Sequence, residues 1–325
     1  MFMKHTHRMK TVVLLAFIAV ILGACRKAHE KQPEQRFSEG FVEVEGGKIW
    51  YRVLGQGDKT PLIAMHGGPG GTHRSFYLLE PITEDRHLIL FDQLGSGKSG
   101  AHRDTSLLKV DNFVEQVHAL RRALDLDEVY LLGASWGTAL ALESYLAHPE
   151  GVKGIIFNSP YFSTTVWEAD ADTLITYLPD SIQQAIEEGE RTGQFDAPAY
   201  QEANRVFLNN YGRRKDRVPT SWDTVKAPRS AFIYNYMWGP TEFTATGTLK
   251  NYDRIERLKT IEVPVLFITG EYDEARPQTV EKFQALVPGS QFEVIEGAGH
   301  STLNDNPGQN IRVIREFLDH LDEEN

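Results

Sequence analysis

The chain has 325 residues, of which 41% are hydrophobic and 24% are charged. This composition is typical of a globular protein, and the length allows one large core together with a compact accessory segment. The formal net charge is -11. Because phosphate binding requires a basic surface, this charge argues against a nucleic-acid partner.

The first 24 residues have the composition of an export signal. Lys4, Arg8 and Lys10 precede an uncharged apolar run at residues 11–24. The run is shorter than the roughly 20 residues that span a bilayer, and it suits the apolar part of a signal peptide. We therefore expect residues 1–24 to be a signal peptide.

The apolar run ends in Leu22-Gly23-Ala24-Cys25, which resembles the lipobox of bacterial lipoproteins, where the cysteine carries a lipid. Cys25 is the only cysteine, so the chain has no disulfide to form. We expect lipidation at Cys25, a flexible tether at residues 25–36, and an exported protein anchored to a membrane of the cell envelope. An ordinary cleaved signal and an uncleaved anchor are the alternatives.

Short apolar runs alternate with helical patterns along most of the remaining chain. Two runs joined across Gly46-Gly47 predict an antiparallel hairpin, and further runs predict strands buried on both faces, as in a parallel sheet. The predicted strands are residues 41–44, 48–54, 61–66, 87–92, 128–133, 152–158, 263–269 and 291–295. Helical periodicity is found at residues 111–124, 136–147, 279–286 and 311–321. The alternation predicts a doubly wound, mostly parallel α/β sheet with right-handed crossovers.

The alternation breaks between about residues 160 and 253. This stretch carries helical patterns, for example at residues 181–189, and many aromatic residues, but no clear strand pattern. The aromatic content argues against a disordered insertion. We therefore predict a helical cap at residues 161–252, which divides the sheet domain into a first part at 37–160 and a second part at 253–325.

Residues 133–137 read Gly-Ala-Ser-Trp-Gly and fit the pattern G-x-S-x-G. They follow a strand pattern and open a helix pattern, which is the context that the nucleophile elbow of α/β hydrolases requires. The helix N-terminus would also stabilise negative charge near Ser135. We predict an α/β-hydrolase fold with Ser135 as the nucleophile. The alternative is a structural turn with an idle serine.

A serine hydroxyl needs a base to remove its proton, and in this fold the acid and the histidine follow the serine along the chain. Asp273 stands just after one predicted strand and His300 just after the next. Ligand crevices form at these carboxyl ends of the strands. We predict that His300 is the general base and that Asp273 orients it. The alternative is that Asp273 and His300 are ordinary charged residues of the surface. Two other acidic residues, Glu271 and Glu274, flank Asp273.

Residues 66–70 read His-Gly-Gly-Pro-Gly and follow a predicted strand. In this fold that loop supplies one amide of the oxyanion hole, and the residue after the nucleophile supplies the other. We expect these amides to be those of Gly68 and Trp136, with Gly67 as the alternative to Gly68. The glycines are otherwise explained by a tight turn.

Three motifs together resemble the signature of the prolyl iminopeptidase family of serine peptidases, and they lie at residues 66–70, 92–99 and 133–137. The resemblance extends from about residue 41 to the C-terminal helix. It implies a capped α/β hydrolase that releases a residue, often proline, from the free N-terminus of a peptide through an acyl-enzyme. It implies no metal or organic cofactor, and no metal-binding pattern such as H-E-x-x-H is present.

The resemblance also implies two carboxylates at the ammonium group of the substrate. Glu242, within the cap sequence Met-Trp-Gly-Pro-Thr-Glu-Phe, is similar to one of them, and Glu274 to the other. Two carboxylates favour a charged N-terminus, because a blocked one would leave them desolvated and unpaired. Trp238 and Thr241 stand where relatives often carry asparagine, which predicts an altered amine pocket. The alternatives are a surface glutamate at 242 and a helix N-terminal acid at 274.

Two other functions remain open from the sequence. The first is an esterase, amidase or lactonase for small hydrophobic acyl groups, which would have no need of the two glutamates. The second is a binding protein without activity, against which the complete triad argues. A dehalogenase is disfavoured because it needs a carboxylate where Ser135 stands. The sequence leaves the oligomeric state undetermined.

Overall fold

The computed structural model describes residues 37–220 and 226–324 of the chain. The predicted signal peptide at residues 1–24, the lipidation site Cys25 and the tether at residues 25–36 lie outside the described residues. No helix in the described part of the chain is both long enough and apolar enough to cross a membrane.

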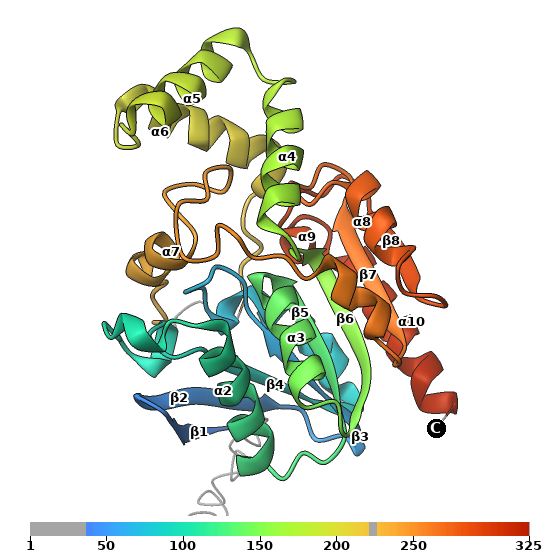
Figure 1. The fold of residues 1–325 in the computed structure, drawn as a ribbon. Helices are drawn as coiled ribbons and strands as arrows, with labels where there is room; N and C mark the ends of the chain where they lie inside the picture. Colours follow the sequence, from blue (N-terminus) through green and yellow to red (C-terminus); the bar gives the residue numbers. More distant parts are fainter. Residues whose placement is uncertain (1–36, 221–225, 325) are drawn as a thin grey trace, which may run out of the picture. The chain divides into compact units, whose positions relative to one another are not determined.

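Eight strands form one sheet in the order β1-β2-β4-β3-β5-β6-β7-β8 (Figure 1). The strands are β1 (Phe37–Val44), β2 (Gly47–Leu54), β3 (Lys59–Met65), β4 (Arg86–Asp92), β5 (Val129–Ser135), β6 (Val152–Pro160), β7 (Val265–Gly270) and β8 (Gln291–Ile295). The β1–β2 and β2–β4 pairs are antiparallel, and all other neighbours are parallel. The predicted mostly parallel sheet of an α/β hydrolase is thus confirmed.

The first hairpin differs from the sequence prediction by one residue at its turn. Val44 pairs with Gly47, so the turn is Glu45-Gly46 and Gly47 already belongs to β2. Gly46 has a φ of 83°, a left-handed conformation that glycine adopts at no steric cost. β1 also starts before its predicted first residue, because its polar beginning pairs with β2 up to Phe37 opposite Leu54.

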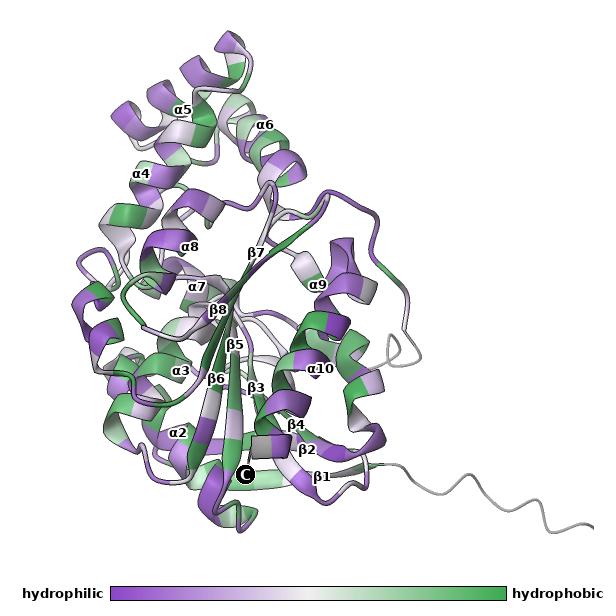
Figure 2. Ribbon diagram, turned by 90° about the vertical axis from the view of Figure 1, so that its right-hand side faces the viewer, coloured by the Kyte–Doolittle hydropathy of each residue, from purple (hydrophilic) through white to green (hydrophobic). Residues whose placement is uncertain are grey.

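Alternate residues of the central strands pack into different cores. In β3, Ile63 and Met65 belong to one hydrophobic cluster, whereas Leu62 and Ala64 belong to another. The hydrophobic strands at the centre of Figure 2 are therefore covered on both faces. This explains why the strands read as continuous apolar runs, since neither face of the sheet meets water.

Helices α2, α3 and α8 contribute to the first cluster, and η1, α9 and α10 contribute to the second. These elements are α2 (Val110–Ala123), α3 (Trp136–Ala147), α8 (Pro277–Gln284), the 3-10 helix η1 (His73–Glu84), α9 (Thr302–Asp305) and α10 (Pro307–Glu324). Short 3-10 helices complete the core at η2 (Gly97–Ser99), η3 (Thr105–Leu107) and η5 (Ile255–Thr260). The sequence analysis missed η1. It also placed the starts of α8 and α10 too late, because proline suits the first turn of a helix.

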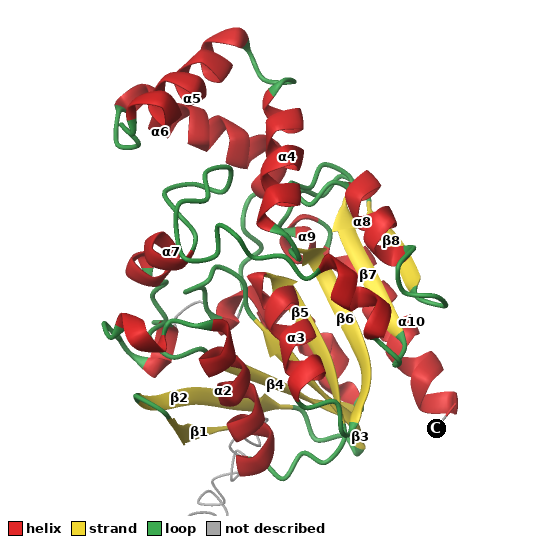
Figure 3. Ribbon diagram, viewed as in Figure 1, coloured by secondary structure: helices red, strands yellow, loops and turns green. Residues whose placement is uncertain are grey.

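Between β6 and β7 the described residues form helices and loops (Figure 3). The elements are α4 (Thr164–Ile175), α5 (Asp180–Thr192), α6 (Pro198–Phe207), the π-helical turn η4 (Leu208–Gly212) and α7 (Ala231–Met237). A separate hydrophobic cluster, which includes Leu174, Ile186 and Phe207, holds α4, α5 and α6 together. We call this insertion the cap.

The two ends of the cap lie beside each other at the carboxyl end of β6. The Thr164 amide donates to the Tyr252 carbonyl at 2.9 Å, and the Arg254 amide donates to the Phe162 carbonyl at 2.8 Å. Because the chain leaves and re-enters the sheet domain at one point, the cap is inserted without separating β6 from β7, which pair directly.

Candidate active site

Ser135 is the last residue of β5 and is followed at once by α3. Its backbone has φ 56° and ψ −127°, a strained conformation for a residue with a side chain. The turn depends on glycine, because a Cβ on Gly137 would lie only 1.9 Å from the carbonyl oxygen of Met65. The local structure is therefore the sharp strand-to-helix turn that the motif predicts, with Ser135 at its tip.

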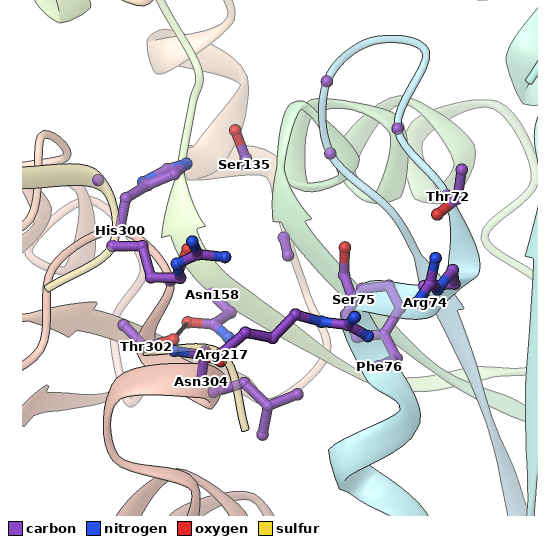
Figure 4. A pocket seen from close by; sticks show the side chains of 18 of the residues that line it. Thr72, Arg74, Ser75, Phe76, Ser135, Asn158, Arg217, His300, Thr302 and Asn304 are labelled. Atoms are coloured by element: carbon purple, nitrogen blue, oxygen red, sulfur yellow. Dashed lines mark hydrogen bonds between the residues drawn. The ribbon is translucent and has the colours of Figure 1, made fainter. Parts of the chain in front are cut away.

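His300 lies in the loop between β8 and α9, and its Nδ1 is 2.7 Å from Oδ1 of Asp273, in the turn after β7. With the proton on Nδ1 donated to this carboxylate, Nε2 is left as an acceptor. Ser135 and His300 line the same cavity, and Figure 4 shows the His300 ring turned toward Ser135. No hydrogen bond joins Ser135 to His300 in the described residues, a looseness common in catalytic sites without substrate.

The Asp273 carboxylate is buried and held by several donors. Oδ1 also accepts from the Ala275 amide at 2.9 Å, and Oδ2 accepts from the Gly270 amide at 3.1 Å and from Ser159 Oγ at 2.6 Å. Ser159, near the end of β6, has a φ of 54° and lies 3.1 Å from the His300 carbonyl. The sequence analysis missed Ser159, because nothing in the local sequence signals this contact.

The cap fixes the His300 loop through the backbone. The His300 amide donates to the carbonyl of Tyr211, in η4 of the cap, at 2.7 Å. Asp305 adds a second link, since its buried carboxylate accepts from the Gly299 amide and from the Arg214 amide, both at 3.0 Å. The position of the imidazole therefore depends on the cap as well as on the sheet.

The residues predicted for the oxyanion hole lie beside Ser135. Gly68 and Trp136 both line a small pocket together with Ser135. Gly68 has a φ of 121°, and no backbone acceptor takes up its amide in the described residues. Gly67, the alternative, packs so closely that a Cβ there would lie 2.9 Å from the Cβ of Ser135.

All three sequence motifs are joined by hydrogen bonds through His66 and Gln93. The Gln93 amide donates to His66 Nε2 at 3.1 Å, and the Trp136 indole donates to Gln93 Oε1 at 3.1 Å. Burial lowers the pKa of His66 to about 4, so the ring is neutral and accepts a hydrogen bond. This network fixes the loop at residues 66–70 relative to the residue that follows the nucleophile.

The structure brings both predicted glutamates into the cavity that contains Ser135. Glu242 follows α7 in the cap, whereas Glu274 follows β7 in the sheet domain. The Glu274 side chain is 2% exposed, and its Oε2 has no hydrogen-bond partner in the described residues. Burial raises the pKa of Glu274 well above its ordinary value, and the charge of His300 opposes this effect.

Three carboxylates act on the single imidazole of the site. Glu274 Oε1 lies 3.8 Å from His300 Nδ1, in addition to the direct contact with Asp273. Burial alone would lower the pKa of His300, but the charges of Asp273, Glu274 and Glu242 outweigh it and raise the pKa to about 9. Any positive group placed between the glutamates would weaken this effect and favour the neutral ring.

The small pocket beside Ser135 is walled by aromatic residues from the cap and the sheet domain, including Tyr161, Trp167 and Trp238. The Trp167 ring lies 5.4 Å from the His300 ring, edge to face. The Trp238 indole donates to the Thr241 carbonyl at 2.7 Å and is buried. The sequence analysis left the cap aromatics unassigned, because a cap core and a pocket wall have the same composition.

The small pocket meets a wider cavity of about 620 Å³ at Ser135. Pockets of this size hold small molecules and short peptides. Its lining includes His300, both glutamates and the His-Gly-Gly loop. The side chains of Ser135, His300, Glu242 and Glu274 and the backbone of Gly68 therefore surround one space.

Comparison with known proteins places these features in context. Residues 60–307 match the α/β hydrolase fold family. A proline iminopeptidase of Heyndrickxia coagulans is 41% identical over 288 residues, which cover 88% of this chain and 100% of that protein. The crystal structure of VinJ has a TM-score of 0.80 at 28% identity and covers 87% of this chain and 99% of its own. That of a proline iminopeptidase from Mycobacterium smegmatis has a TM-score of 0.77 at 28% identity, covering 88% and 99%.

Proposed function

The chain belongs to the proline iminopeptidase family of α/β hydrolases, and from this premise we propose that it is a serine aminopeptidase that releases N-terminal proline from peptides. The observation that carries the proposal is the placement of two glutamates, Glu242 from the cap and Glu274 from the sheet domain, in the cavity of Ser135. A buried carboxylate oxygen without a partner is costly unless the ligand supplies a donor. An ammonium group does so.

Ser135 acts as the nucleophile and His300 as the general base. With the proton of Nδ1 held by Asp273, Nε2 accepts the Ser135 hydroxyl proton while Oγ attacks the carbonyl carbon of the first residue. The Gly68 and Trp136 amides stabilise the oxyanion that forms. His300 then returns the proton to the leaving amine. In the second half of the reaction, His300 takes a proton from water as the water oxygen attacks the acyl-enzyme. It then gives this proton to Ser135 Oγ, which leaves as the free hydroxyl.

The first residue of the substrate binds where the small aromatic pocket opens into the wide cavity at Ser135 and Glu242, because the small pocket itself holds only about 10 Å³. Glu242 lines both pockets and Glu274 lines the wide cavity, so a residue bound at their junction places its ammonium near the glutamates and its carbonyl at the nucleophile. Trp167 and Trp238 provide flat apolar walls, which suit the compact ring of proline. Trp238 thus contributes to the altered amine pocket predicted from the sequence, whereas Thr241 bonds to Tyr200 instead.

The test compares prolyl anilide with its N-acetylated form and with a simple ester. Wild type should hydrolyse the free amine with strong preference, and Ser135→Ala should abolish all activity. Glu242→Gln and Glu274→Gln should each lower kcat/KM for the free amine by about 30- to 1000-fold, which corresponds to roughly 2–4 kcal/mol for a buried charge contact. Equal hydrolysis of the acetylated substrate would contradict the aminopeptidase and favour the esterase or amidase alternative.

We propose in addition that the chain is exported and lipidated at Cys25. The support is the sequence of residues 1–25, with its basic start, apolar run and single cysteine. One acyl chain gives weak membrane binding, whereas the multiple chains of a lipoprotein hold firmly. Expression in a bacterial host with labelled fatty acid tests this proposal. Wild type should carry label and sediment with membranes, and Cys25→Ser should lose the label. An unlabelled wild-type protein would refute the lipidation.

A further inference from the structure

Four arginines line the wide part of the catalytic cavity, and none of them lines the small aromatic pocket. They come from separate segments, with Arg74 in η1, Arg213 and Arg217 after η4, and Arg229 before α7. Figure 4 shows Arg217 extending across the pocket in the direction of Arg74, away from Ser135. Tertiary folding therefore gathers this group from three places in the chain.

The charge of this region opposes that of the chain as a whole. The full sequence has a net charge of -11, and yet the described lining of the wide cavity includes four arginines and only two acidic residues. Those two are Glu242 and Glu274, which also lie with Ser135 and His300. The cavity therefore offers acidic side chains where the substrate ammonium binds and basic side chains along the rest of its lining.

The direction of the bound peptide follows from the two pockets. With its first residue against the mouth of the aromatic pocket and its carbonyl at Ser135, the remainder of a peptide continues into the wide cavity, which alone has room for it. The far end of a short peptide is a free carboxylate. Guanidinium groups bind carboxylates through paired hydrogen bonds, and they keep their charge at all relevant pH values.

We propose that the arginine-lined part of the cavity is a subsite for the free C-terminal carboxylate, so that the substrates are short peptides rather than the N-termini of intact proteins. This inference rests on the proposed aminopeptidase function. Arg74 is half-buried, whereas Arg213, Arg217 and Arg229 are exposed. A less hydrated charge contributes more to binding, so Arg74 should have the largest effect.

The experiment uses the full chain with prolyl-glycyl-glycine, the C-terminal amide of this peptide, and prolyl anilide. Wild type should show a kcat/KM for the free acid that is roughly tenfold above that for the amide, mainly through KM. Arg74→Gln and Arg217→Gln should lower this acid-to-amide ratio toward one and leave anilide hydrolysis within about twofold. Arg74→Lys should keep part of the preference, because the charge remains.

Arg312→Gln is the matched control, since Arg312 lies on the exposed surface of α10 beside Glu316 and should leave the ratio unchanged. The wild-type comparison requires no variant to fold. Equal hydrolysis of the acid and the amide by wild type would overturn the subsite while leaving the aminopeptidase intact. Arginine variants that lose anilide and peptide hydrolysis together would also overturn the subsite. A wild type that hydrolyses none of the three substrates would overturn the proposed function and the subsite with it.

Discussion

Replacing Glu274 with glutamine is expected to move the acid limb of the pH–activity profile to lower pH. The imidazole of His300 must be neutral to accept the serine proton, and its pKa is raised to about 9 because the charges of Asp273, Glu274 and Glu242 outweigh burial. Glutamine has nearly the shape of glutamate, so the substitution removes one charge and leaves the cavity filled. With less negative charge nearby, the ring loses its proton at lower pH.

The size of the shift follows from the geometry. Glu274 Oε1 lies 3.8 Å from His300 Nδ1, and two unit charges at this distance interact by about 4 kcal/mol at an effective dielectric constant near 20. This corresponds to about three pH units if the carboxylate is fully ionised. Because burial also raises the pKa of Glu274, its charge is partial, and we expect a shift of about one to three pH units.

The assay measures kcat/KM for p-nitrophenyl acetate between pH 5 and 10, because this ester has no ammonium group and reports the free enzyme. The matched control is Glu271→Gln, which removes an exposed carboxylate from the same turn and should leave the limb in place. An acid limb that stays near pH 9 in Glu274→Gln, or that moves to higher pH, would refute the argument that Glu274 controls the base.

Three further outcomes follow from the structure. Ser159→Ala should lower kcat about tenfold with KM nearly unchanged, because the carboxylate beside His300 loses a 2.6 Å hydrogen bond; an unchanged kcat would contradict this positioning role. Thermal stability should peak near pH 6.5, the ordinary pKa of histidine. Below pH 6.5 the unfolded chain binds a proton that the buried His66, with its pKa of about 4, does not bind, so stability falls. Above pH 6.5 the folded His300, with its pKa of about 9, holds a proton that the unfolded chain has lost, so stability falls again. A melting temperature that is flat from pH 4 to 9 would refute both. Gly137→Ala should cost about 3 kcal/mol or more in urea unfolding, because its Cβ would lie 1.9 Å from a carbonyl oxygen of β3, whereas Gly308→Ala, in open space, should cost little.

Local patterns predict the location of the candidate catalytic segments. Ser135 is predicted as the nucleophile because a glycine-flanked serine stands between an apolar strand and a helix, and these patterns depend only on neighbouring residues. Asp273 and His300 were placed at strand ends by the same reasoning. The order of strands in a parallel sheet then brings such ends to one edge, which is why motifs far apart in the sequence were expected to meet.

The supporting contacts depend on distances that no local pattern records. Ser159 reaches Asp273 only because β6 and β7 pair with a particular register. The bond between the Tyr211 carbonyl and the His300 amide requires the cap to fold back over the last loops of the sheet domain. Side chains such as Trp167 carry no sign in the sequence of whether they pack inside the cap or against the nucleophile.

The sequence by itself therefore determined the fold class, the candidate reacting groups and the existence of a helical insertion, since strand, helix and turn preferences act over a few residues. The tertiary structure alone decided what surrounds those groups: the burial of Glu274, the aromatic walls of the small pocket and the gathering of Arg74, Arg217 and Arg229 on one cavity. Burial and proximity are properties of the packed chain, and they set the charge state and the selectivity of a site whose chemistry the sequence had already indicated.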